Sequence, residues 1–126
     1  MLSVIWRVKT MNKYRDKSDF EINKAVAVNI NGTDAVVEKF GRIYINDEDR
    51  SAMVSFDPCN NPYDAMPIII ENKICMAYDV FAEERDGGNW VAQPAYGFSD
   101  ERVRGDNYYR AAMICFLMMK DAENES

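Results

Sequence analysis

Three arginines near the carboxyl end of the chain have residue types and spacing that suit phosphate binding. Arg102, Arg104 and Arg110 lie within nine residues, and Tyr108 and Tyr109 stand beside the last of them. Guanidinium groups bind phosphate through paired hydrogen bonds, and aromatic faces stack on nucleobases. The combination predicts a patch for a nucleotide-like ligand. Surface salt bridges are the alternative interpretation, because three acidic residues lie among the arginines.

Two predicted helix openings could extend such a patch. The runs Asn60-Asn61-Pro62 and Gly105-Asp106-Asn107 each precede an apolar helical segment. Free backbone N–H groups and the positive end of the helix dipole bind anions at such positions. Ordinary helix capping by the asparagine or aspartate side chains is the alternative.

Aromatic residues could form one wall of a ligand pocket. Trp90 follows a Gly-Gly turn and lies close in sequence to Tyr96 and Phe98. Such rings either line a pocket or fill the core beneath a sheet. The predicted ligand-binding set is Asn60, Asn61, Tyr63, Trp90, Tyr96, Arg102, Arg104, Asn107, Tyr108, Tyr109 and Arg110.

Enzyme chemistry is not expected from this sequence. The chain has no histidine, and its three cysteines form no Cys-x-x-Cys motif, so we predict no metal site and no cofactor. Cys59 stands beside a helix opening, which could lower its pKa, but no histidine is present to act as its base. Asp79, Glu83 and Glu84 are the nearest approach to a carboxylate cluster, and the last two are adjacent and would face opposite sides of a strand.

Length and charge restrict the class of protein. A chain of 126 residues, 48% hydrophobic, suits one domain over residues 1–126, with 1–11 as an extension and 121–126 as a frayed tail. The net charge of −6 argues against binding to bulk nucleic acid. No apolar run approaches the roughly 20 residues of a membrane span, so no membrane partner is expected. Unpaired cysteines are typical of a cytoplasmic protein.

Three helices and five strands must position these residues. A capping box that begins at Ser18 predicts a helix over 19–28. A second helix should occupy 62–73, and a third, largely buried, 109–120. Alternating or β-branched segments predict strands at 35–40, 42–45, 52–56, 74–83 and 90–93, with a hairpin turn at 86–89 and a polar loop over 95–104. This order predicts an α+β protein, an α/β/α sandwich whose small antiparallel sheet is covered by three helices.

Segments 18–27, 59–69 and 110–119 resemble a family of small proteins of tailed phages, the NinX-like proteins. The runs Asn60-Asn61-Pro62 and Arg110-Ala111-Ala112-Met113 carry the resemblance, which extends over most of residues 12–121. A weaker similarity reaches the phage ABA-sandwich domains and implies the α/β/α sandwich. The resemblance implies an accessory, non-virion gene product of an infected bacterium and names no reaction.

Two functional hypotheses follow. In the first, a non-catalytic phage accessory protein in the cytoplasm of the infected host binds and sequesters a small anionic, nucleotide-like host ligand and so counters antiphage defence. The alternative is a protein-interaction module that binds a host or phage protein through its acidic surface. Because exposed sheet edges can pair with a second copy, a homo-oligomer remains open.

Overall fold

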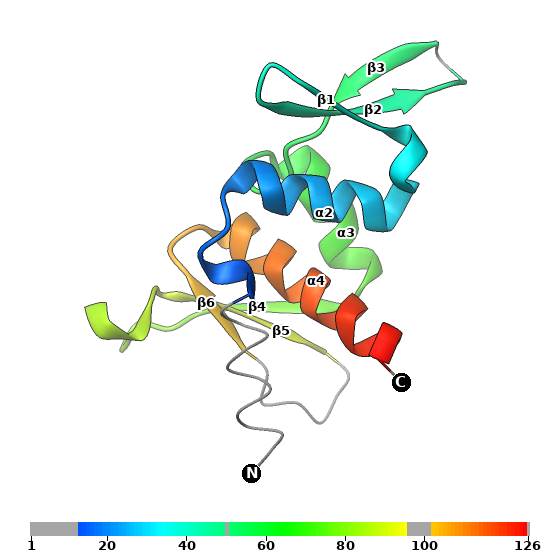
Figure 1. Cartoon of the computed structure of the whole chain (residues 1–126). Helices are drawn as coiled ribbons and strands as arrows, with labels where there is room; N and C mark the ends of the chain where they lie inside the picture. Colours follow the sequence, from blue (N-terminus) through cyan, green and yellow to red (C-terminus); the bar gives the residue numbers. More distant parts are fainter. Residues whose placement is uncertain (1–12, 50, 96–101, 126) are drawn as a thin grey trace.

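Helix α4 (Tyr108–Glu125) runs through the middle of the structure (Figure 1). The computed structural model describes residues 13–49, 51–95 and 102–125. Every residue from 111 to 118 is buried, and α4 contacts both other long helices and one of the two sheets. The prediction of a largely buried last helix is therefore confirmed. The helix also includes residues 121–125, which we expected to form a frayed tail; the expected extension at 1–11 lies outside the described residues.

The other two helices begin where the sequence predicts. Helix α2 (Asp19–Asn31) is capped by the Ser18 hydroxyl, which accepts a hydrogen bond from the Glu21 backbone N–H at 3.2 Å. It ends at Gly32, whose φ of 84° suits glycine, and so extends beyond residue 28. Helix α3 (Pro62–Glu71) is capped by the Asn61 side chain and continues through an internal proline.

The first sheet has the order β1-β2-β3 and is antiparallel. Strands β1 (Val36–Lys39) and β2 (Arg42–Asp47) are joined by a two-residue turn in which both residues have positive φ. Strand β3 (Ala52–Ser55) is the far edge and is exposed along its whole length. A 3₁₀ turn (Thr33–Ala35) links this sheet to α2, against which β1 and β2 pack.

The second sheet has the order β4-β5-β6 and packs against α4. Strands β4 (Ile74–Tyr78) and β5 (Trp90–Pro94) are antiparallel, so the hairpin is confirmed. Its connection is longer than predicted and contains a 3₁₀ turn (Glu84–Asp86), because β4 ends at residue 78 and not at 83. Strand β6 (Val103–Gly105) occupies part of the segment that we expected to be a polar loop.

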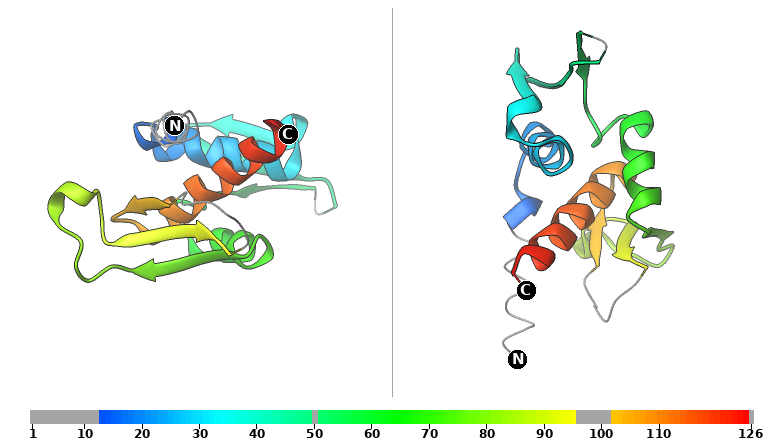
Figure 2. Two further views of the ribbon diagram at one scale, coloured as in Figure 1. Left: turned by 90° about the horizontal axis from the view of Figure 1, so that it is seen from below. Right: turned by 90° about the vertical axis from the view of Figure 1, so that its right-hand side faces the viewer.

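The expectation of one sheet covered by three helices is wrong. The helices lie between two small, separate sheets, as both the front view and the side view show (Figures 1 and 2). Helix α3 connects β3 to β4 and packs on α4, so the two sheets lie on opposite sides of the helices. The class α+β holds, but the layer order differs from the predicted sandwich.

The burial of α4 makes a direct prediction. Ala112 is 0% exposed, so Ala112→Asp places an unpaired carboxylate in the core and should lower the free energy of unfolding by about 4 kcal/mol or more. Ala122→Asp, on an exposed turn of the same helix, should change it by less than about 1 kcal/mol. Urea unfolding followed by circular dichroism measures both. A stable Ala112→Asp protein would contradict the assignment of this face to the core.

Candidate ligand-binding site

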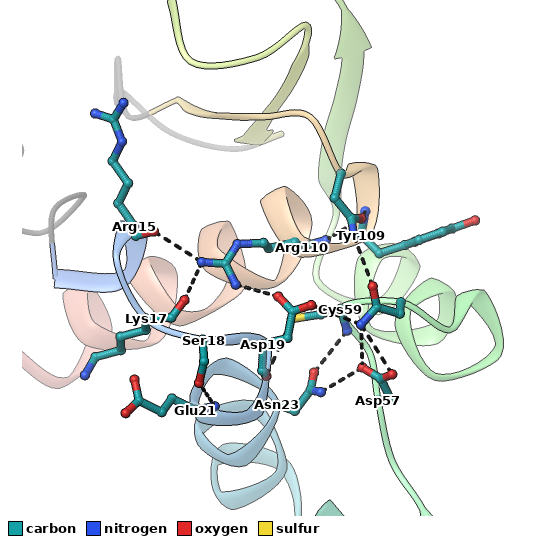
Figure 3. Close-up of polar contacts among 12 residues, drawn as sticks. Arg15, Lys17, Ser18, Asp19, Glu21, Asn23, Asp57, Cys59, Tyr109 and Arg110 are labelled. Atoms are coloured by element: carbon teal, nitrogen blue, oxygen red, sulfur yellow. Dashed lines mark hydrogen bonds and ion pairs between the residues drawn. The ribbon is translucent and has the colours of Figure 1, made fainter. Parts of the chain in front are cut away.

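Arg110 fixes the segment before α2 to the beginning of α4 (Figure 3). One guanidinium nitrogen, Nη1, donates to Asp19 Oδ1 at 2.6 Å. The other, Nη2, donates to the carbonyl oxygens of Lys17 at 2.5 Å and Arg15 at 3.2 Å. The side chain is 23% exposed. The polar groups of Arg110 are therefore largely used in contacts within the protein. The salt-bridge interpretation applies to this arginine, but its partner is Asp19, a carboxylate distant in the sequence.

A second set of polar contacts joins α2 to the turn before α3. Asn23 is buried, and its amide nitrogen donates to Asp57 Oδ1 at 2.7 Å. Its amide oxygen accepts a hydrogen bond from the backbone N–H of Cys59 at 3.0 Å (Figure 3). Both polar ends of this buried side chain are thus satisfied, as burial requires.

The two predicted helix openings lie side by side. Asn107 caps α4, since its side-chain oxygen accepts from the backbone N–H groups of Tyr109 and Arg110 at 2.9 and 3.1 Å. Its amide nitrogen donates to Asn60 Oδ1 at 3.3 Å, and Asn60 in turn donates to Asp19 at 3.1 Å. Side chains of the protein occupy the first positions at which an anion would bind, so the capping interpretation applies to both helix starts.

Arg104 holds the β4–β5 connection against β6. Its Nη2 donates to Asp79 Oδ2 at 2.9 Å, and its Nη1 approaches the Gly88 carbonyl oxygen at 3.4 Å. The hydrogen bond from Arg104, followed by that from the Phe81 backbone N–H, lowers the pKa of Asp79. Gly88 is required here, because a Cβ on it would lie 2.2 Å from the backbone of Gly105.

These contacts surround a cavity of about 470 Å³. It lies between β6, the first turns of α4 and the β4–β5 connection, and we name it the arginine cavity. Four arginines and two aspartates line it together with apolar floor residues and two glycines. Arg15 and Arg102 make no ion pair within the described part of the chain. The full lining is Arg15, Asp86, Gly87, Arg102, Val103, Arg104, Gly105, Asp106, Asn107, Arg110, Ala111 and Ile114.

The predicted aromatic residues gather elsewhere. Trp90 packs edge-to-face on Tyr78 and on Tyr108, with ring centroids 5.0 and 4.9 Å apart, and Tyr108 contacts Tyr109 at 5.0 Å. None of these rings lines the arginine cavity. The rings lie between β4, β5 and α4, and Tyr108 and Tyr109 pack against the core; Phe98 lies outside the described residues.

The structure therefore divides the predicted set. Arg102, Arg104, Asn107 and Arg110 line one cavity, and Asn60 reaches it through Asn107. Asn61 acts as the cap of α3. The remaining members lie apart: Trp90, Tyr108 and Tyr109 in the aromatic cluster, Tyr63 on a different groove, and Tyr96 outside the described residues.

Sequence reasoning missed Arg15 and the partners of the other arginines. Arg15 lies close to Gly87, since a Cβ there would be 3.6 Å from its Nη2. Nothing in its local sequence signals this position, which depends on the packing of the first described residues on α4. The sequence marks Asp79 only as a carboxylate on a predicted strand, and Asp19 only as the first residue of a predicted helix.

The idea of a lowered pKa at Cys59 is wrong. The thiol is 0% exposed. Burial, followed by the negative charge of Asp19, raises the pKa of Cys59 to about 12. In the described residues, no group of three or more ligating side chains could hold a metal ion.

A small α+β protein with a polar, arginine-lined cavity is the class that fold and site define. A family model described as Bacteriophage P22, NinX matches residues 13–120, most of the chain, and the chain therefore belongs to this family. The match spans the three segments that carry the resemblance in the sequence. No curated protein and no solved structure matches the chain. Within the described residues, no helix is long and apolar enough to span a bilayer.

The buried asparagine can be tested by truncation. Asn23→Ala leaves the buried Cys59 N–H without its acceptor and removes one of the two hydrogen bonds to Asp57 Oδ1, so it should lower the free energy of unfolding by about 3 kcal/mol. Asn29→Ala, an exposed position in the same helix with a single bond to the Ala25 carbonyl, should cost less than about 1 kcal/mol. Urea unfolding of both variants gives the comparison, and equal losses would show that the buried contacts carry no special weight.

Thiol labelling at pH 8 tests the raised pKa. Cys75 is exposed, whereas Cys59 and Cys115 are buried. Because the thiolate is the reactive species, an aromatic disulfide reagent should label Cys75 fast and the other two only after denaturation. The Cys75→Ser variant should show no fast phase. A fast phase that survives in that variant would mean that a buried thiol is accessible.

Proposed function

We propose that this NinX family member is a non-catalytic accessory protein that binds a small anionic, nucleotide-like ligand in the arginine cavity. The observation that carries the proposal is the convergence of four arginines on one cavity of about 470 Å³. That volume lies within the range of sites for small ligands. Arg15 and Arg102 supply the contacts to the anion, because Arg104 and Arg110 already hold Asp79 and Asp19.

The floor of the cavity suits the rest of such a ligand. Val103, Ala111 and Ile114 present apolar surface between the arginines. A nucleobase or ribose face can cover this surface while its phosphate meets the guanidinium groups. Two glycines in the walls keep the backbone accessible to a ligand.

Two carboxylates in the lining make the cavity selective. Asp86 and Asp106 accept hydrogen bonds and repel a second anionic group. A ligand that carries phosphate at one end and amino or hydroxyl donors at the other satisfies both kinds of residue. Nucleotides have this composition, and inorganic phosphate does not, so we expect nucleotides to bind more tightly than phosphate.

Sequestration fits a phage protein of this kind. A protein that holds a host nucleotide signal unchanged lowers its free concentration and so counters a defence that depends on that signal. The action requires a firm, preformed site, and the arginine cavity is bounded by the ion pairs of Arg104 and Arg110. Its place of action would be the cytoplasm of the infected host.

A nucleotide panel tests the proposal. Mono-, di- and cyclic nucleotides are added to the pure protein, and the melting temperature and the dissociation constant are measured. A bound nucleotide at 100 times its dissociation constant adds about 2.7 kcal/mol, which should raise the melting temperature by roughly 10 °C. The nucleotide recovered by chromatography should be unchanged. No shift with any nucleotide would refute the proposal, and turnover would make the protein an enzyme.

Matched variants locate the site. Arg102→Ala and Arg15→Ala remove guanidinium groups that form no ion pair with any described residue, so they should weaken binding about tenfold to a hundredfold without loss of stability. Arg42→Ala, an exposed arginine of β2 outside the cavity, makes the same change in net charge and should leave the dissociation constant within about twofold. Equal weakening by all three variants would indicate a general charge effect and no site.

A further inference from the structure

A second and larger groove, of about 980 Å³, lies where the β1–β3 sheet meets α2 and α3. In Figure 1 this sheet extends from the body of the protein beyond the two helices. We name the hollow the acidic groove. No described residue lines both this groove and the arginine cavity. Whatever occupies it must therefore be explained separately from the nucleotide-like ligand.

The floor and flanks of the acidic groove are apolar. Ile45 and Val54 are cross-strand partners on neighbouring strands, so their side chains stand next to each other on one face of the sheet. Ile30 at the end of α2 and Tyr63 at the start of α3 flank them. Val54 is 41% exposed, Ile30 47% and Tyr63 85%. A row of accessible apolar side chains in a hollow is typical of an interaction site.

The rim carries a strong excess of negative charge. Among the residues that the structure describes, six carboxylates and one cationic side chain line the groove. That cation, Lys120, lies 3.4 Å from Glu123 and so is already opposed by a carboxylate. The carboxylates belong to Asp34, Asp47, Glu48, Asp49, Asp64 and Glu71.

Strand β3 offers a further means of attachment. It is the outer strand of its sheet and pairs only with β2 among the described strands. All four of its residues are exposed. An edge strand of this kind presents free backbone donors and acceptors to an incoming segment.

We infer that the acidic groove docks a Lys- and Arg-rich segment of another protein whose apolar side chains enter between Val54 and Tyr63. Charge complementarity selects this occupant: carboxylates on the rim attract cationic residues and speed their approach. The same rim repels the phosphates of a nucleic acid. It also disfavours a second copy of this chain, whose net charge is −6.

The test uses a designed probe. It is an amphipathic peptide in which leucine and lysine alternate, so that it can lie extended beside β3, and its counterpart has glutamate in place of lysine. Titration calorimetry should detect binding of the lysine peptide and no binding of the glutamate peptide. In amide NMR spectra of the isotopically labelled full chain, shifts should gather on residues of the acidic groove. Binding of the glutamate peptide, shifts spread over the whole surface, or no binding of the lysine peptide would each overturn the inference.

Variants separate the groove from net charge. Glu48→Lys with Glu71→Lys reverses two rim charges and should weaken the lysine peptide at least about tenfold. The control, Asp16→Lys with Glu84→Lys, makes the same change in net charge at exposed positions outside the groove and should weaken it less than about threefold. Equal losses in the two double variants would overturn the inference.

An uncharged change tests the apolar floor. Val54→Ser keeps every charge. It should weaken binding of the lysine peptide about threefold to tenfold, because the bound peptide covers the exposed Val54 side chain and serine offers less apolar surface to cover. Peptide binding that Val54→Ser leaves unchanged would overturn the inference. A dimer detected by sedimentation that Val54→Ser dissociates would also overturn it, since the occupant of the groove would then be a second copy of this chain. Nucleotide binding should be unaffected by the groove variants, so failure here is distinguishable from failure of the proposed function.

Discussion

Burial of the apolar middle of α4 is the interaction on which the rest of the structure depends. Residues 111–118 are all buried, and they contact α2 and α3 together with the β4–β6 sheet. A helix that is apolar on nearly every side must be covered by other elements. Here the helices and strands that cover it come from distant parts of the chain. Because Asn107 caps α4 and Arg110 lies in its first turn, this packing also brings their polar groups to α2 and to the turn before α3.

The arginines show how one residue type serves two purposes. Arg104 and Arg110 each bind a carboxylate and a backbone carbonyl, and thereby join segments that are distant in the sequence. A guanidinium group has five N–H donors in fixed directions, so it can join several acceptors at once. Arg15 and Arg102 lie beside them without such partners among the described residues. We therefore assign the proposed contacts with the ligand to Arg15 and Arg102, and not to the two paired arginines.

The net charge of −6 conceals two surfaces of different character. Four arginines meet at the first turns of α4, whereas six carboxylates line a groove that reaches Phe116 and Lys120 further along the same helix. Composition gives only their sum, so it argued against bulk nucleic acid and could not indicate a local basic site. The proposed nucleotide site and the proposed docking groove are separate cavities, so the two proposals do not exclude each other.

Local features of the chain were readable from the sequence, and contacts between distant segments were not. The caps at Ser18 and Asn61, the burial of the last helix and the NinX family depend on residues a few positions apart or on short runs. By contrast, Arg104 and Asp79 are 25 positions apart, and Arg110 and Asp19 are 91 apart. Strand β6 is three residues long, too short for an alternating pattern, and it exists because β5 offers it an edge. The sequence alone determined the helices and the class α+β. Tertiary packing decided the separation of the sheets, the partner of each arginine and the place of Arg15, because these depend on which surfaces α4 brings together.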